Sequence, residues 1–357
     1  MIRGVTLAEN ASLAARNGFR VSARAELFVD VRETEGLGEL FALPWMRSAP
    51  ILVLGEGSNT LIVGDVPGAV VSINALGRQI ISDDGTNVRL RVAAGEHWDD
   101  VVHWSIGLGL AGLENLALIP GTAGAAPIQN IGAYGTEVGE FIEAVEAWDR
   151  HRETPCVLTR AECAFGYRDS IFKREPARWL ITAVQMRLPR QRVPRIDYPG
   201  LAEELVRLGA DTQARPAQIA EAVTRLRTRK LPNPNLVPNL GSFFRNPVVP
   251  LSVADALQRD EHAMPVYATN DPQQRKLSAA WLIERAGWKG YREGDAGVAA
   301  QHALVLVNHG QASGAQMLDL ARRIAASVED RFEISLQPEV RIIGADWNAA
   351  DCLAQPA

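Results

Sequence analysis

The chain has 357 residues, 47% hydrophobic and 22% charged, a profile typical of a soluble globular protein of about two or three domains. Its formal net charge of -5 argues against a general nucleic-acid binder. Residues 1–20 lack the apolar core of a signal peptide, no stretch approaches the roughly 18 apolar residues of a membrane span, and three scattered cysteines favour a reducing cytoplasm.

The first half of the chain is predicted to be rich in strands. Residues 19–34 alternate apolar and polar side chains, as a half-buried strand does, and further strand-like segments follow at 61–73 and 87–95. A helix is expected over 97–110, with Gly107 as its stop. Two more strands are predicted, at 141–149 and 178–188.

The second half alternates helices with strands. Helices are predicted at 217–230, after Ser278 as N-cap, and at 313–332, where apolar residues recur at helical spacing. Residues 231–250 are proline-rich and are expected to be irregular. Strands are predicted at 303–308 and 334–344. Together these patterns indicate an α+β protein.

Two loops of small residues stand out. Residues 51–63, ILVLGEGSNTLIV, place a glycine turn between two strands, with neither the lysine of a Walker loop nor the helix that a Rossmann loop opens. This turn is either an ordinary hairpin or a phosphate cradle of another architecture. A second region, 118–140, contains four glycines within 121–135. Small side chains let main-chain N–H groups approach an anion, so the pair suits a diphosphate such as that of FAD, although composition alone leaves buried hairpin tips equally open.

Seven segments, in order, resemble the UDP-N-acetylenolpyruvoylglucosamine reductase family, of the type with a mobile tyrosine loop: GEGSNTLI, LIPGTAGAAPIQNIGAYGTE, FGYRDSIFK, RTRKLP, NLGSFFRNP, AAWLIERAGWKG and QPEVRIIG. The resemblance implies a vanillyl-alcohol-oxidase/PCMH-type FAD-binding fold of two α+β subdomains, plus a third α+β substrate-binding domain. We expect residues 1–75, completed by 330–357, to form the first FAD-binding subdomain, 76–228 the second, and 229–329 the substrate-binding domain.

The family further implies which residues contact FAD. The first loop would contribute five of them and the second loop ten, with one arginine near the C-terminus. These are Gly55, Gly57, Ser58, Asn59, Thr60, Ile119, Pro120, Gly121, Gly124, Ile128, Asn130, Ile131, Gly132, Ala133, Tyr134 and Arg341.

Three residues fall on catalytic positions of the family: Arg168, Ser242 and Glu339. Taken alone, each has an ordinary explanation, as a local ion pair with Asp169, a turn serine and a solvated carboxylate. In the reaction that the resemblance implies, hydride adds to the methylene carbon of an enolpyruvyl ether and charge develops on the neighbouring carbon and its carboxylate. Arg168 can pair with that carboxylate, Glu339 can help only when protonated, and Ser242 can deliver a proton to the carbanionic carbon.

The implied activity is reduction of UDP-N-acetylglucosamine enolpyruvate to UDP-N-acetylmuramate in peptidoglycan precursor synthesis, with FAD as cofactor and NADPH as reductant. Substrate contacts are expected from Tyr167, Tyr198, Lys230 and Asn246. We expect a cytoplasmic enzyme, monomeric, with no metal, nucleic-acid or membrane partner. The tail 345–357 has no counterpart in the family and is expected to be loosely ordered.

Two other functions compete with this interpretation. Another FAD oxidoreductase of the same fold, such as a sugar oxidase, would consume oxygen with simple sugars and without NADPH. A nucleotide-sugar-binding protein without redox activity would be colourless, whereas a flavoprotein would be yellow and would bleach on addition of NADPH.

Overall fold

The computed structural model describes residues 2–210 and 213–348, which divide into two compact units. Unit 1 takes its residues from 1–11, 25–56 and 67–229, and unit 2 from 12–24, 57–66 and 230–357. Each unit is thus built from three separate stretches of the chain. The division into three domains remains a prediction.

Unit 1 contains a small sheet whose strands lie in the order β1-β2-β5-β3. These strands span Val5–Ser12, Arg24–Val31, Val66–Ile73 and Ile51–Val53 respectively, and the helices α1, Leu37–Ala42, and α2, Pro44–Ser48, follow β2. β2 alternates exposed and buried side chains at its start, which confirms the strand predicted within 19–34. β3 and β5 run parallel, with Leu52 opposite Val70.

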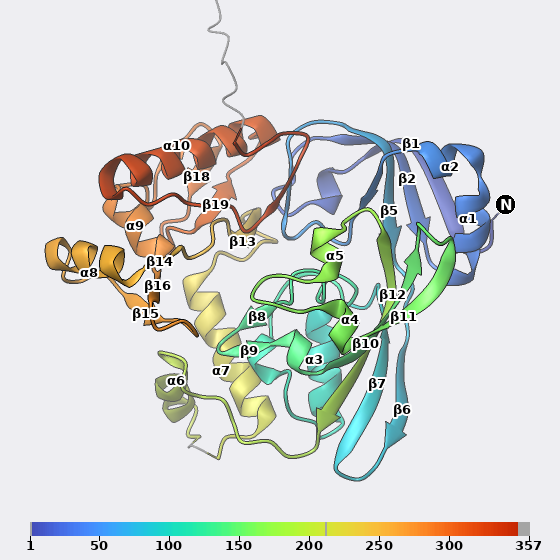
Figure 1. Cartoon of the computed structure of the whole chain (residues 1–357), viewed down its shortest axis with the longest axis horizontal. Coiled ribbons are helices and arrows are strands. Elements are labelled where there is room, and N and C mark those ends of the chain that lie inside the picture. Colours follow the sequence, from blue (N-terminus) through green and yellow to red (C-terminus); the bar gives the residue numbers. More distant parts are fainter. Residues whose placement is uncertain (1, 211–212, 349–357) are drawn as a thin grey trace, which may run out of the picture. The chain divides into compact units, whose positions relative to one another are not determined.

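A larger antiparallel sheet in unit 1 has the order β11-β10-β12-β7-β6. Its strands run side by side in Figure 1. They span Thr154–Thr159, Ile142–Asp149, Trp179–Pro189, Asn87–Ala93 and Arg78–Asp83. The three strands predicted at 87–95, 141–149 and 178–188 are therefore confirmed.

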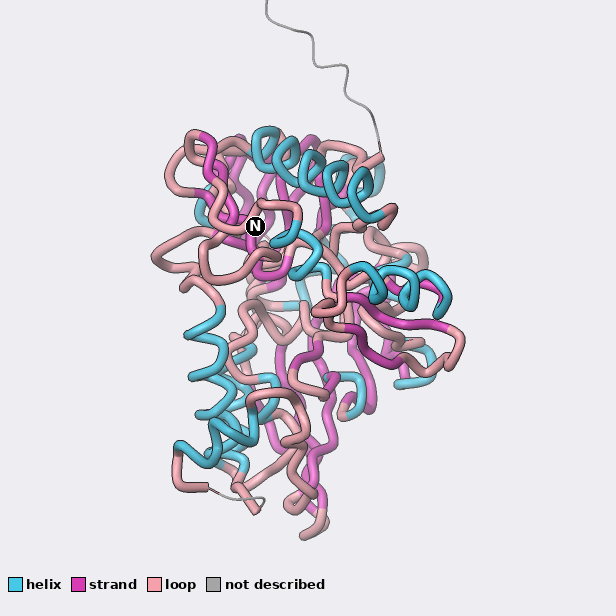
Figure 2. The backbone as a smooth tube through the Cα atoms, turned by 90° about the vertical axis from the view of Figure 1, so that its left-hand side faces the viewer, coloured by secondary structure: helices cyan, strands magenta, loops and turns pink. Residues whose placement is uncertain are grey.

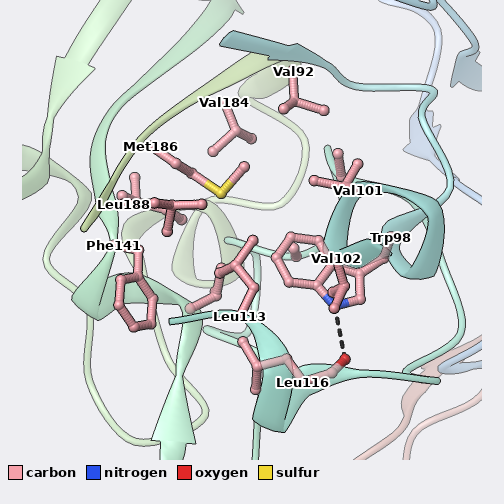
Figure 3. Close-up of a cluster of buried hydrophobic side chains, with 14 of the residues drawn as sticks. Val92, Trp98, Val101, Val102, Leu113, Leu116, Phe141, Val184, Met186 and Leu188 are labelled. Atoms are coloured by element: carbon pink, nitrogen blue, oxygen red, sulfur yellow. Dashed lines mark hydrogen bonds between the residues drawn. The ribbon is translucent and has the colours of Figure 1, made fainter. Parts of the chain in front are cut away.

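The larger of two hydrophobic clusters in unit 1 lies against this sheet. It includes buried residues of β7 and β12, of α3, Trp98–Gly107, and of α7, Pro216–Lys230. Figure 3 shows Trp98 beside Val101 and Val102, with the indole N–H donating to the carbonyl of Leu116 at 3.0 Å. The pairing satisfies the one polar group that this large side chain buries. Shorter elements of the unit are β8, Gly132–Ala133, β9, Thr136–Glu137, α4, Arg160–Cys163, α5, Ile171–Arg174, and α6, Leu201–Arg207.

The described residues of unit 2 form three sheets. The largest has the order β13-β19-β18-β17, and the others are β14-β16-β15 and the parallel pair β20-β4. The strands are β4 Thr60–Ile62, β13 Asn239–Ser242, β14 Val248–Pro250, β15 Val266–Ala268, β16 Gln274–Leu277, β17 Arg292–Glu293, β18 Ala296–Val298, β19 Val305–Asn308 and β20 Arg341–Ile343.

The helices of unit 2 are α8, Leu251–Asp260, α9, Ala279–Arg285, and α10, Gly314–Phe332. Figure 2 shows α10 as a long helix lying across strands of its own unit, and its nearest strands are β18, β19 and β4. Ser278 and Ser313 cap α9 and α10 by accepting from the N–H of Trp281 and Gln316. Both helices confirm the sequence prediction.

Two predictions about irregular and extended segments are corrected. The proline-rich segment 231–250 is not wholly irregular, because it contains the strands β13 and β14. Its prolines lie outside these strands, except for Pro250, the last residue of β14. The strand predicted over 334–344 is reduced to β20, since Pro338 instead forms an isolated bridge with Phe244. No helix among the described residues is long and apolar enough to cross a membrane.

Candidate active site

The glycine turn at 54–59 joins strands of different sheets. β3 pairs with β5, whereas β4 pairs with β20, so the turn is not the tip of a hairpin. At Gly57, φ is +65° and an added Cβ would stand 2.3 Å from the carbonyl oxygen of Arg16, so only glycine fits there. Gly55 lies against the second loop, where a Cβ would come within 3.2 Å of the Thr122 hydroxyl oxygen.

Asn59 connects the first loop to the C-terminal segment of unit 2 by two hydrogen bonds. Its side-chain amide donates to the carbonyl of Glu339 at 3.3 Å, and its own carbonyl accepts from the N–H of Arg341 at 3.0 Å. The next residue, Thr60, opens the parallel pairing of β4 with β20. Residues predicted to contact FAD and two residues of the C-terminal motif therefore belong to one local structure.

The second loop is held by main-chain hydrogen bonds at the end of β7. The N–H of Gly124 donates to the Ala94 carbonyl at 2.9 Å, and that of Ala123 to the Glu96 carbonyl at 2.8 Å. A Cβ at Gly124 would stand only 2.6 Å from the Cβ of Ala94. The small residues of this loop are thus required by how closely its backbone approaches β7.

Left-handed backbone marks the far end of the same loop. Tyr134 and Gly135, with φ of +48° and +80°, form the tip of the β8–β9 hairpin, which is the sign pattern of a type I′ turn. Asn130 also has a positive φ, +46°, and its buried side chain donates to Glu137 and to the Gly166 carbonyl and accepts from the N–H of Gly139. Its side chain is committed to hydrogen bonds within the protein, so a contact with FAD would fall to its main chain.

Arg168 stands in a second left-handed turn, with φ +55°. The turn is closed by reciprocal main-chain hydrogen bonds between Gly166 and Asp169, and the Arg168 guanidinium donates to the Gly132 carbonyl at 2.8 Å. Asp169 pairs with Arg174 at 3.1 Å, which gives its carboxylate a partner other than Arg168. A strained non-glycine residue held by its surroundings is common at functional sites. Within unit 1 the structure therefore brings Arg168 to the loop predicted to hold FAD.

Tyr198 lies beside Tyr134, with ring centroids 4.8 Å apart in an edge-to-face arrangement. Burial raises the pKa of the Tyr134 hydroxyl. Tyr167, predicted to contact substrate, is exposed, and its ring lies 5.5 Å from the Arg168 guanidinium carbon. Four predicted site residues of unit 1, namely Tyr134, Tyr167, Arg168 and Tyr198, thus lie in or close to the β8–β9 hairpin.

Arg227 of α7 is a candidate anion-binding residue that the sequence analysis missed. Desolvation by burial lowers its pKa, partly countered by Tyr134 and Asp99, and its Nε has no hydrogen-bond partner within the described ranges 2–210 and 213–348. The Arg227 side chain is half-buried, and a buried guanidinium N–H without an acceptor is costly unless an anion meets it. The signal that could have found it is the motif RTRKLP, in which Arg227 stands three residues before Lys230.

In unit 2, Ser242 and Glu339 lie on adjoining backbones. The N–H of Glu339 donates to the carbonyl of Phe243 at 2.8 Å, and the N–H of Arg245 donates to the Gln337 carbonyl at 3.0 Å. Ser242 itself ends β13, opposite Val305 of β19. Two candidates nearly a hundred residues apart in the chain are thus joined by one short main-chain pairing.

The remaining candidates of unit 2 are Arg341, Lys230 and Asn246. Burial lowers the pKa of Arg341, as expected of a cation withdrawn from water. Lys230 is exposed at the end of α7. The pKa of His302 is lowered mainly by desolvation and further by the positive charges of Lys230 and Lys289. The side-chain oxygen of Asn246 accepts from the N–H of Ala279, the first residue of α9, so Asn246 has a structural role whatever else it binds.

Comparison with known proteins defines the class first. Residues 25–153 match a family described as FAD binding domain. Gly57 and Gly121 have positive φ, a backbone geometry that can turn main-chain N–H groups toward an anion. The loops therefore fit a cofactor that carries a diphosphate. No group of three or more histidine, cysteine or acidic side chains in the described part of the chain could hold a metal ion.

The particular family follows from longer matches. Residues 233–343 match the C-terminal domain of UDP-N-acetylenolpyruvoylglucosamine reductase. Two reductases of that name, from Xanthomonas euvesicatoria pv. vesicatoria and Xanthomonas campestris pv. campestris, are 52% and 51% identical over 96% of this chain and 98% and 97% of their own. The solved structure of the reductase from Thermus caldophilus superposes with a TM-score of 0.64 at 26% identity, covering 95% of this chain and 98% of that one. The chain belongs to the UDP-N-acetylenolpyruvoylglucosamine reductase family.

Proposed function

We propose that the chain is the FAD-dependent enzyme that uses NADPH to reduce UDP-N-acetylglucosamine enolpyruvate to UDP-N-acetylmuramate, in the cytoplasm and as a monomer. Family membership supports the reaction. The local pairing that joins Ser242 to Glu339 supports the assignment of its chemistry to these residues, because it places a hydroxyl and a carboxyl group on adjoining backbones. Bound FAD would supply the hydride that is added to the substrate's methylene carbon.

Arg168 would hold the carboxylate of the enolpyruvyl group. Its planar guanidinium can make two parallel hydrogen bonds to a carboxylate. The hydrogen bond to the Gly132 carbonyl fixes one nitrogen of that group and so orients the plane. As charge develops next to the new C–H bond, a guanidinium placed in advance stabilises it without reorganisation.

Ser242 would give its hydroxyl proton to the carbon next to the carboxylate, completing the addition of two hydrogens across the double bond. A serine hydroxyl is a weak acid, so its position must carry most of the effect. Glu339, when protonated, would donate a hydrogen bond to the same developing charge. We assign the diphosphate to Tyr198, Lys230 and Arg227, and further substrate contacts to Tyr167 and Asn246.

The two half-reactions can be measured separately. Purified enzyme should be yellow, should bleach on addition of NADPH without substrate, and should regain its colour when the enolpyruvyl substrate is added. Double-reciprocal plots of the initial rates should give parallel lines, and excess substrate should inhibit the enzyme. A colourless protein that FAD does not reconstitute, or intersecting lines, would contradict the proposal, and oxygen uptake with simple sugars would favour a sugar oxidase.

Ser242→Ala tests the proton donor. Bleaching by NADPH should stay within about twofold of wild type, whereas recovery of colour with substrate should slow by a factor of about a hundred to ten thousand, the usual range for loss of general acid catalysis. Ser335→Ala, at an exposed serine between α10 and β20, is the matched control and should change neither rate. Equal loss of both half-reactions in Ser242→Ala would show that the serine does something else.

A further inference from the structure

We propose that Trp347, in the segment that follows the last family motif, is a positioning residue for Ser242 and Glu339. The proposal rests on the function assigned above to those two residues. The chain leaves β20, turns at Gly344, where φ is +88°, and places the Trp347 ring against Phe244. The centroids are 5.9 Å apart and the planes meet at 68°, an edge-to-face contact.

Phe244 lies where the backbone segments of Ser242 and Glu339 pair. It lies two residues after Ser242, and its backbone forms an isolated bridge with Pro338, the residue before Glu339. Its ring is almost fully buried and contacts Phe243 edge to face, with centroids 5.0 Å apart. Because densely packed side chains transmit displacement, a shift of Phe244 moves the Ser242 backbone and the Glu339 backbone together.

The turn that carries Trp347 is fixed from its other side as well. The guanidinium of Arg322, on α10, donates to the carbonyl of Asp346, and the Asp346 carboxylate accepts from the N–H of Asn348 at 3.0 Å. Trp347 is therefore held at both faces of the turn and is only partly exposed, although it stands ten residues before the end of the sequence. The expectation of a loosely ordered tail is wrong for 345–348, and 349–357 lie outside the described residues.

These contacts give Trp347 a defined role. NADPH oxidation does not use the Ser242 proton, whereas reduction of the enolpyruvyl group does. A misplacement of about 1 Å at a reacting group can cost up to about a hundredfold in rate. Loss of the Trp347 ring should therefore slow the second half-reaction and leave the first intact.

The test compares full-length variants that all bind FAD. In Trp347→Ala, recovery of flavin colour with the enolpyruvyl substrate should slow about tenfold or more, and bleaching by NADPH should stay within about twofold of wild type. Trp347→Phe keeps an aromatic edge and should recover at least half of the wild-type rate. Arg322→Met frees the turn from its other side and should give the same selective loss. The control is Trp45→Ala, at a 41% exposed tryptophan of unit 1.

Amide hydrogen exchange gives a readout that does not depend on turnover. Trp347→Ala should speed exchange in 243–245 and 337–341, leaving α3 unchanged. The proposal would be overturned if Trp347→Ala changed neither the rates of the half-reactions nor amide exchange. It would also be overturned if Trp347→Ala lost its bound FAD and slowed both half-reactions equally. Failure of the proposed function has a different signature: wild-type colour would not return with the enolpyruvyl substrate, or Ser242→Ala would remain fully active, whatever exchange shows for Trp347.

Discussion

Replacing Gly124 by alanine would put a methyl group where Ala94 already stands. The new Cβ would lie 2.6 Å from the Ala94 Cβ and 3.1 Å from the Ala94 carbonyl oxygen, whereas carbon atoms in contact prefer about 3.5–4.0 Å. The loop must therefore move by about 1 Å. It cannot do so freely, because the N–H groups of Ala123 and Gly124 are both hydrogen-bonded to residues 94–96.

The magnitude follows from known costs of overpacking. Extra methyl groups in tightly packed sites typically destabilise by about 1–3 kcal/mol. If the displaced loop loses the same free energy in its contact with FAD, the dissociation constant rises roughly 5- to 150-fold, since about 1.4 kcal/mol is a factor of ten. The chain offers a matched control in Gly107, the last residue of α3, where an added Cβ meets nothing within 4 Å and φ is not positive.

Two assays separate these effects. Urea unfolding of the FAD-free protein measures the stability term, and titration with FAD, followed by flavin fluorescence, measures affinity. Gly107→Ala should be neutral or stabilise by up to about 1 kcal/mol and should bind FAD normally. If Gly124→Ala unfolds within 0.5 kcal/mol of wild type, a difference about as small as a typical surface substitution, and binds FAD within about twofold, the reasoning about the second loop is refuted.

Three further outcomes are expected. Hydrogen bonds from Arg229, then from Arg207, lower the pKa of Glu204 from its usual 4.5 to about 2. The resulting stabilisation is complete above about pH 4.5 and is lost as the pH falls towards 2. The difference in urea midpoint between wild type and Glu204→Gln should therefore shrink over that range and stay constant above it. Trp98→Phe removes the donor to the buried Leu116 carbonyl and should cost about 1–3 kcal/mol in urea unfolding; a cost under 0.5 kcal/mol would contradict it. Arg227→Met should leave the melting temperature unchanged or raised and weaken binding of the UDP-substrate about tenfold or more, the range of a charge-assisted hydrogen bond; normal affinity would remove Arg227 from the site.

Local signals in the sequence predicted most elements. Ser278 and Ser313 stand directly before apolar residues at helical spacing, and both cap the predicted helices. An alternating pattern located β2, and strand-like segments located β7, β10 and β12 of the large sheet. The other two strands of that sheet, β6 and β11, were not predicted. The family motifs singled out Arg168, Ser242 and Glu339. In the structure Arg168 contacts the second loop, and Ser242 and Glu339 lie on adjoining backbones. Their roles, like every FAD contact, remain proposals.

What the sequence hid depends on pairing between distant residues. Nothing near residues 60–62 reveals that β4 pairs with β20 rather than with β3, because parallel partners can lie anywhere in the chain. Pro338 belongs to a strand-like pattern but bridges Phe244, which shortened the last strand. The family motif places Asn130 at a FAD contact, and only the structure shows that its side chain is hydrogen-bonded to Glu137, Gly139 and Gly166.

The parallel pairing of β4 with β20 also bears on how the chain is made. Ile62 leaves the ribosome about 280 residues before Arg341, the first residue of its partner strand. At roughly 5–20 residues per second, β4 must wait about 14 to 56 s for that partner. During this interval its buried apolar residues Leu61 and Ile62 are uncovered on the nascent chain. Synthesis of β20, rather than emergence of the glycine turn, is therefore the event that completes the first loop.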